Sequence, residues 1–423
     1  MTALKLYQAP QGAGDSFPPL PALCPAASQT RLRLRTLGLA LGLSLATGLA
    51  LSAPLQPAPA PALAQVAAQT TTVVDIVGRR VRIPAKVDHI LLGEGRFLYA
   101  LALMEGAEPL KRIVGWQGEL AFADPNGWAA YQQLFPQITQ IPLIGRTSEE
   151  SVSAEKSVST QPDIAIFGLG GHGPGRQSGL VQALEKAGVP VVFIDFRAQP
   201  VRNTAHSIRI LGQAVQREAQ ANAYADFYEA HLQRVQSRVK NIPADQRPLV
   251  FAELLAGVWD GCCHTAGKGN VGEFIDAAGG VNIAAGKIPG AIGDLNQEAL
   301  IAQDPAVYIA TGSRPQGSRP MVRAGEGVSA AQLASSLREL TQRPGFEMLS
   351  AVRSGRAHGL WHNFYDAPTN ILAIEAMAKW FYPERFADVD PQATMAEINQ
   401  RFLPALPMQG AYWGDMAPRK AAP

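Results

Sequence analysis

The feature that most constrains the fold of this chain is a long stretch without glycine or proline, from Gln213 to Asn241. Apolar residues recur there every three or four positions, from Ala221 to Ile242, which predicts one apolar stripe on a helix. At ~1.5 Å per residue, a continuous helix over that stretch would reach roughly 40 Å, enough to run along two domains. Because such a helix is stiffer than loops, we expect any closing of two domains around it to be small.

Short β-type runs alternate with helical runs on both sides of this stretch. The predicted strands are 73–75, 81–83, 90–92, 113–114, 164–167, 191–194, 249–253 and 307–310. Helical patterns follow or separate several of them, over 180–187, 271–278 and 369–381. Strands separated by helices favour parallel sheets with crossover helices. We therefore expect an α/β protein of two Rossmann-like lobes, each with a mostly parallel central sheet flanked by helices, joined by one long rigid interlobe helix.

The N-terminus has the features of an export signal. Alternating arginines at 31–35 precede an apolar run over 37–53 that contains no charge. Small residues ending at Ala64 then fit a cleavage site, so we expect a signal peptide cleaved near Ala64 and a periplasmic protein. The alternative is a membrane anchor, because a run of about 17 residues is at the lower limit for spanning a bilayer.

The patterns together predict a division of the chain. It comprises a signal peptide (1–64), an N-terminal α/β lobe (65–200), an interlobe helical segment (201–242), a C-terminal α/β lobe (243–410) and a tail (411–423). The whole chain has 37 Lys and Arg against 35 Asp and Glu, and the signal peptide holds four of these basic residues against one acidic residue. The predicted mature chain has no positive excess for binding nucleic acid.

Two segments, 153–166 and 296–309, share one pattern: a helix carrying Glu, then Pro beside Asp, then a strand. With the glycine-containing segment 265–283, they resemble the helical-backbone class of periplasmic substrate-binding proteins. These proteins serve ABC importers of ferric siderophores, haem and cobalamin. The resemblance covers roughly residues 70–390 and implies a binding protein without a cofactor, not an enzyme. A monomer is the simplest arrangement for such a protein.

The resemblance also implies partners. A ferric siderophore or similar iron complex would bind between the lobes and pass to an ABC permease dimer in the inner membrane. In that family one surface glutamate on each lobe docks into arginine pockets of the permease, and the matching positions here are Glu155 and Glu298. Two exposed carboxylates would fix the orientation of docking by charge complementarity. An isolated exposed glutamate is more often merely solvated.

The ligand residues are expected in loops after the carboxyl ends of parallel strands, where open α/β sheets bind ligands. Arginine suits an anionic iron chelate because its planar fork bonds carboxylate or catecholate oxygens in pairs. Tryptophan and tyrosine offer flat apolar walls. The candidates at such positions are Glu94, Arg96, Trp116, Arg146, His172, Arg197, Trp259, His264, Arg314, Trp361, His362 and Tyr365.

Haem or a bare metal ion is the alternative ligand for the same fold. His172, His264, His362 or Tyr365 could serve as an axial ligand of haem iron. Cys262 and Cys263 stand beside His264 as a compact group of soft ligands for a metal. Adjacent cysteines are also compatible with a vicinal disulfide or with free thiols, and the sequence leaves these states open.

A dinucleotide-dependent oxidoreductase is the alternative of a different class. The loop Gly168–Gly173 matches the glycine fingerprint of dinucleotide-binding folds, and Asp195 stands near the expected acidic position. However, Pro174 and Gly175 continue the loop, so the third glycine would not lie in a helix and the pyrophosphate would lose its helix N-terminus. A glycine-rich ligand loop is the better interpretation.

Overall fold

The structure is a computed structural model, and it describes residues 71–170, 173, 175–258, 261–313 and 320–416. All of these belong to one compact unit, Val66–Pro423. The predicted signal peptide and its cleavage site at Ala64 lie outside the described residues. No helix in the described ranges combines the length and the apolar character that crossing a membrane would need.

The N-terminal lobe is built on a parallel sheet of five strands in the order β5-β4-β3-β6-β7. Its strands are β3 (Ile90–Leu92), β4 (Ile113–Gln117), β5 (Leu143–Gly145), β6 (Ile164–Gly168) and β7 (Val191–Ile194). Its helices are α1 (Leu98–Glu105), α2 (Leu120–Ala123), α3 (Pro125–Leu134), α4 (Ala154–Ser159) and α5 (Gly179–Lys186). The central strands are buried runs of branched apolar residues, as expected for a parallel sheet covered on both faces.

The first two predicted strands do not join this parallel sheet. β1 (Thr71–Val74) and β2 (Arg80–Ile83) form a separate antiparallel hairpin, because the short turn between them cannot make a crossover. The carboxylate of Asp75 accepts hydrogen bonds from the backbone N–H and from Nε of Arg79, both at 2.9 Å, and so holds the turn.

The C-terminal lobe contains a mixed sheet in the order β11-β9-β8-β12-β14-β16, with β10 also paired to β8. The parallel strands are β8 (Leu249–Glu253), β10 (Val281–Asn282), β12 (Val307–Gly312) and β14 (Ala357–Trp361). The antiparallel strands are β9 (His264–Ala266), β11 (Ile292–Asp294) and β16 (Trp413–Asp415). The predicted tail from residue 411 is therefore partly wrong, because β16 pairs with β14 and extends the sheet.

Six helices and a small ladder complete the described part of this lobe. The helices are α8 (Val271–Ala277), α9 (Gln297–Gln303), α10 (Ala330–Leu340), α11 (Ser350–Arg353), α12 (Ile371–Phe381) and α13 (Pro391–Arg401). The short strands β13 (Gly325–Glu326) and β15 (Gly410–Ala411) pair with each other, and α3 of the N-terminal lobe packs against β13.

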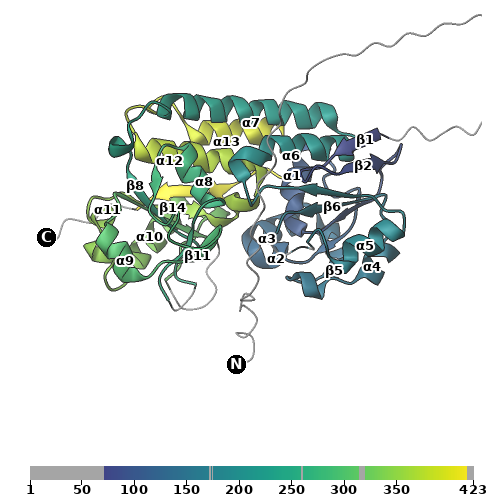
Figure 1. Cartoon of the computed structure of the whole chain (residues 1–423), viewed down its shortest axis with the longest axis horizontal. Coiled ribbons are helices and arrows are strands. Elements are labelled where there is room, and N and C mark those ends of the chain that lie inside the picture. Colours follow the sequence, from purple (N-terminus) through teal and green to yellow (C-terminus); the bar gives the residue numbers. More distant parts are fainter. Residues whose placement is uncertain (1–70, 171–172, 174, 259–260, 314–319, 417–423) are drawn as a thin grey trace, which may run out of the picture. The chain divides into compact units, whose positions relative to one another are not determined.

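The long helix predicted between the lobes is present, but it begins at Glu218 instead of Gln213 and a second helix precedes it. α6 (Pro200–Ala214) ends before Gln216, whose φ of 59° is incompatible with a continuing α-helix, and α7 (Glu218–Val239) begins after it. Nη1 of Arg112 donates a 2.9 Å hydrogen bond to the carbonyl of Val215 at this break. α6 and α7 lie side by side (Figure 1). α7 also packs on α1 of the first lobe and on α8 and α12 of the second, so it contacts both.

Candidate functional site

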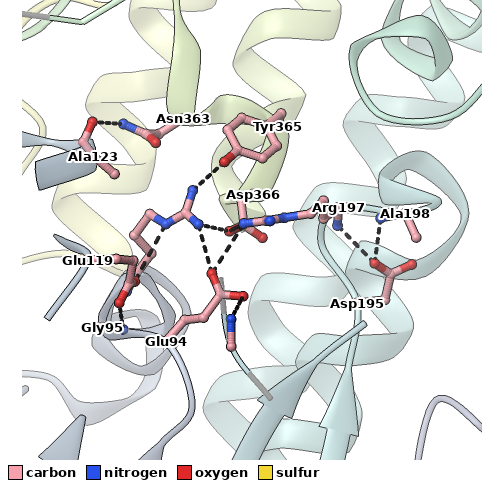
Figure 2. A network of polar contacts seen from close by, with 12 residues as sticks. Glu94, Gly95, Glu119, Ala123, Asp195, Arg197, Ala198, Asn363, Tyr365 and Asp366 are labelled. Carbon is pink, nitrogen blue, oxygen red and sulfur yellow. Dashed lines mark hydrogen bonds and ion pairs between the residues drawn. The ribbon is translucent and has the colours of Figure 1, made fainter. Parts of the chain in front are cut away.

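A buried ion cluster lies where strand ends of the two lobes meet (Figure 2). Glu94 and Arg96 follow β3, Arg197 follows β7, and Asp366 belongs to the 3-10 turn η6 (His362–Asp366) after β14. Nη2 of Arg96 lies 2.7 Å from Oε2 of Glu94 and 3.1 Å from Oδ2 of Asp366. Nη2 of Arg197 lies 2.6 Å from the same aspartate oxygen and 3.2 Å from the same glutamate oxygen. The cluster therefore joins the two lobes directly.

The cluster is closed off from solvent to different degrees. The side chain of Arg96 is 0% exposed, those of Glu94 and Asp366 are 2% and 3% exposed, and that of Arg197 is 14% exposed. Burial by itself would lower the pKa of Arg96, but the acidic side chains around it raise that pKa well above its ordinary value. At Arg197 too, burial would lower the pKa, but Asp366 and Glu94 raise it above its ordinary value. Both guanidiniums therefore stay charged, which buried charges do only when they are paired.

A third carboxylate, Glu119, supports the cluster from the end of β4. Its two oxygens each accept a 2.9 Å hydrogen bond, from the backbone N–H groups of Gly95 and Arg96. Burial and the neighbouring charge of Glu94 raise the pKa of Glu119 to about 7, although Arg96 and the two backbone donors oppose this rise. Gly95 allows the close approach, because a Cβ at this position would meet the carbonyl oxygen of Gln117 at 2.8 Å.

Tyr365 covers the guanidiniums from the C-terminal lobe. Its hydroxyl accepts a 2.6 Å hydrogen bond from Nη1 of Arg96. The centroid of its ring is 5.5 Å from Cζ of Arg96 and 5.0 Å from Cζ of Arg197, within cation–π range. The ring of His362 lies 4.7 Å from the ring of Tyr365, and its Nδ1 is 2.9 Å from Oγ1 of Thr311 at the end of β12.

The structure thus brings together five of the residues predicted for the ligand site, at the strand ends where we expected them: Glu94, Arg96, Arg197, His362 and Tyr365. It adds two that the sequence reasoning missed, Glu119 and Asp366. Both follow the end of a parallel strand, so the same positional rule could have selected them.

The two described tryptophan candidates are core residues. Trp116 is 1% exposed and packs edge-on against Trp128 of α3, with ring centroids 6.2 Å apart. Trp361 is 3% exposed and packs against the rings of Tyr99 and Tyr412, at 5.6 and 5.1 Å. Neighbouring rings cover most of both side chains, although Trp361 also lines a small pocket together with Tyr99 and Tyr412.

The remaining candidates lie apart from the cluster or outside the described residues. Arg146 is exposed after β5, and its backbone N–H donates to Oγ of Ser151 at 2.8 Å. His264 begins β9, with Nδ1 3.0 Å from Oδ1 of Asp294 on β11. The residues that lie outside the described ranges are His172, Trp259 and Arg314. Their role in a ligand site remains a prediction.

The segment after β14 also holds the lobes together by neutral contacts. Nδ2 of Asn363 donates a 2.9 Å hydrogen bond to the carbonyl of Ala123 in the N-terminal lobe (Figure 2). On the connector, the hydroxyl of Tyr228 donates to Oδ1 of Asn370 at 2.8 Å, and that of Tyr224 donates to a backbone carbonyl nearby. The positions of the two lobes are therefore linked through residues 361–370.

The described residues include the two cysteines and part of the glycine loop on which the alternative chemistries were based. No three His, Cys, Asp or Glu side chains among them are grouped as a metal site. Cys262 and Cys263 are joined by a disulfide, and Cys263 is buried. The helix after the glycine loop, α5, begins only at Gly179, so the third glycine of the fingerprint, Gly173, does not lie at a helix N-terminus.

The two glutamates predicted to dock occupy equivalent places in the two lobes. Glu155 and Glu298 are each the second residue of a short helix, α4 and α9, and both are exposed. Each helix is capped by the side chain of the preceding residue, Ser153 or Asn296. Each helix is followed by an inner parallel strand of its sheet, β6 or β12.

Comparisons with known proteins agree with this architecture. A family model described as "Periplasmic binding protein" matches residues 125–360, which is more than half of the chain. The chain is 21% identical over 252 residues to YvrC of Bacillus subtilis (strain 168), an uncharacterised ABC transporter substrate-binding lipoprotein. That match covers 59% of this chain and 71% of the relative.

Solved structures show the same fold. The TroA-like periplasmic binding protein FepB of Veillonella parvula matches with a TM-score of 0.72 and 24% identity, covering 82% of this chain and 99% of that chain. The periplasmic binding protein MolA of Haemophilus influenzae, solved with molybdate bound, matches with a TM-score of 0.61 and 18% identity over 79% and 98% of the two chains. At these identities the likeness concerns the fold alone.

Proposed function

Because the chain belongs to the periplasmic binding protein family, we propose that it is the substrate-binding component of an ABC importer. It captures a ferric siderophore or a related iron complex between its lobes and hands the complex to a permease dimer in the inner membrane. The observation that carries this proposal is the equivalent placement of Glu155 and Glu298 on the two lobes. Its function is binding and delivery, not catalysis.

The two glutamates suit docking to a membrane partner with two similar halves. Each stands in the first turn of a capped helix, where the unpaired backbone N–H groups stabilise a negative charge and the cap fixes the backbone. A carboxylate on each lobe would engage one positive pocket on each permease subunit, so that the two contacts define orientation. In this proposal the N-terminal segment directs the chain to the periplasm and is removed near Ala64.

The iron complex is proposed from the donors near the strand ends. Tyr365 and His362 offer oxygen and nitrogen ligands beside each other, at a ring separation of 4.7 Å. Such groups contact an iron chelate by hydrogen bonding or stacking, and they could also ligate haem iron, which makes haem or a bare metal ion the second candidate cargo. Titration of residues 65–423 with ferric siderophores, haemin and divalent metals, followed by calorimetry, would identify the cargo class.

The docking role is tested by replacing both glutamates. The variant Glu155→Ala/Glu298→Ala should lose uptake of iron complex in cells while the purified protein keeps its affinity for that complex. A matched control is Glu218→Ala/Glu347→Ala, which removes two exposed glutamates from first helical turns elsewhere. Normal uptake by the docking variant would contradict the proposal, and so would an equal loss of uptake in the control.

A further inference from the structure

The ion cluster between the lobes carries no net positive charge. It contains the two guanidiniums of Arg96 and Arg197 and three carboxylates, those of Glu94, Glu119 and Asp366. With Glu119 ionised the formal charge is one negative, and with Glu119 protonated it is zero. At neither extreme does the cluster attract an anion by its overall charge.

The carboxylates also occupy the hydrogen-bonding positions that an anionic ligand would need. Nη2 of Arg197 lies 2.6 Å from Asp366 and 3.2 Å from Glu94, so this donor is already shared between two oxygens. Arg96 is wholly buried, and its two terminal nitrogens contact Glu94, Asp366 and Tyr365. A ligand carboxylate or catecholate could bond Nη2 of Arg197 only by displacing Asp366 or Glu94, and the displaced buried carboxylate would lose one of its two guanidinium contacts.

We propose that Asp366 is a specificity-determining residue: it occupies Arg197 as an internal anion and restricts the cargo to iron chelates of neutral or positive net charge, such as ferric trihydroxamates. This inference rests on the proposed function and names the chemical class of its ligand. It reverses the expectation that the two arginines recognise an anionic chelate. Both arginines are instead positioning residues that hold Tyr365 and Asp366 against the N-terminal lobe.

The first test compares two iron complexes of opposite charge. Purified residues 65–423 are titrated with ferrioxamine B, a cationic ferric trihydroxamate, and with ferric citrate, an anionic complex. The unmodified protein should bind the cationic complex more tightly. Asp366→Asn removes the internal charge and keeps the size of the side chain, so it should shift the ratio of the two affinities toward ferric citrate by about tenfold.

The matched control is Asp415→Asn. Asp415 also pairs with a buried side chain of the same lobe, His358 at 2.7 Å, but it lies on β16 and contacts neither arginine. It should leave the ratio of affinities unchanged. The inference is overturned if the unmodified protein prefers ferric citrate, or if Asp366→Asn and Asp415→Asn give the same ratio.

A second test does not depend on the cargo. Iron-free citrate is added to the unmodified protein and to Asp366→Asn, and the melting temperature is followed. Citrate should stabilise the variant and not the parent. If Asp366→Asn does not fold, Glu94→Gln removes a carboxylate from the same guanidiniums and should give the same result. Failure of citrate to stabilise any folded variant overturns the inference.

If no iron complex binds the unmodified protein, the proposed function fails, and the citrate test alone decides the role of Asp366.

Discussion

Nη2 of Arg197 in the N-terminal lobe lies 2.6 Å from Oδ2 of Asp366 in the C-terminal lobe. The contact is largely buried, with the two side chains 14% and 3% exposed. An ion pair in this setting is costly to break on one side only, because the remaining charge stays buried with fewer partners. The relative position of the two lobes therefore depends on this pair as well as on the connecting helices.

A double-mutant cycle on this pair would measure that dependence. Asp366→Ala should lower the free energy of unfolding by roughly 3–5 kcal/mol, because it leaves both guanidiniums short of a partner. Arg197→Ala should cost less, because Arg96 still lies 3.1 Å from Asp366. The double variant should lower the free energy of unfolding by less than the sum of the two single variants, as measured by urea denaturation.

The surface pair Arg238 and Asp388 is the control, and its cycle should show little coupling. Strict additivity at Arg197 and Asp366 would contradict the assignment.

The pH dependence of stability should carry a contribution from Glu119. Its pKa in the folded chain is raised from 4.5 to about 7, so between these values the folded state holds a proton that the unfolded state has released. The resulting stabilisation is fully present below about pH 4.5 and is lost as the pH rises through 7, by roughly 3 kcal/mol in all.

Replacing Glu119 by Gln removes this titration. Between pH 5 and 8 the variant should lack the corresponding fall in the free energy of unfolding, whatever its absolute stability. The measurement is denaturation of both proteins in the same series of buffers. The idea fails if both proteins show the same slope across that range. Titrations of groups that do not interact with Glu119 cancel in this comparison, because they are common to both proteins.

Gly95 should not tolerate a side chain. An added Cβ would meet the carbonyl oxygen of Gln117 at 2.8 Å and Cβ of Leu120 at 3.1 Å. Gly95→Ala is therefore expected to destabilise the protein by about 1–3 kcal/mol and to displace Arg96 from its partners. Gly179→Ala is the control, since nothing lies within 4 Å of its added Cβ and the residue opens helix α5. Equal melting temperatures for the two variants would be inconsistent with this packing.

Tyr228→Phe tests the link between the connector and the second lobe. The buried hydroxyl donates a 2.8 Å hydrogen bond to Oδ1 of Asn370, and its loss should cost about 1 kcal/mol or somewhat more, because the amide oxygen loses a donor. Tyr382→Phe removes a hydrogen bond of equal length within the C-terminal lobe. Only the first variant should broaden the distribution of distances between spin labels placed on the two lobes. Identical distributions would mean that the hydroxyl of Tyr228 does not hold the lobes.

The sequence indicated the two lobes and most strands because buried parallel strands are short apolar runs that stand out between helices. The interruption of the connector was not predictable in this way. Gln216 and Arg217 are good helix formers, and the carbonyl of Val215 at the break accepts a hydrogen bond from Arg112, more than a hundred positions earlier in the chain. Local propensity carries no information about a partner that is distant along the chain.

The candidate site was predictable in position but not in electrostatics. The rule that ligands bind after strand ends found Arg96 and Arg197, and it would equally have found Glu119 and Asp366. What the sequence does not show is which charges neutralise each other, because that depends on distances between segments such as 94–96 and 365–366. The burial of Trp116 could not be predicted either, because it depends on packing against Trp128, which lies on a neighbouring helix.

The place of β16 has a consequence for how the chain matures. Residues 413–415 form a strand along β14, and Nδ1 of His358 on β14 meets the carboxylate of Asp415 on β16 at 2.7 Å. This edge of the sheet can close only after residue 415 has emerged from the ribosome and, in an exported protein, from the translocation channel. Until then the strand His358–Leu360 offers unpaired backbone groups to any neighbouring chain. A chaperone that shields this edge during export would be expected to raise the yield of folded protein.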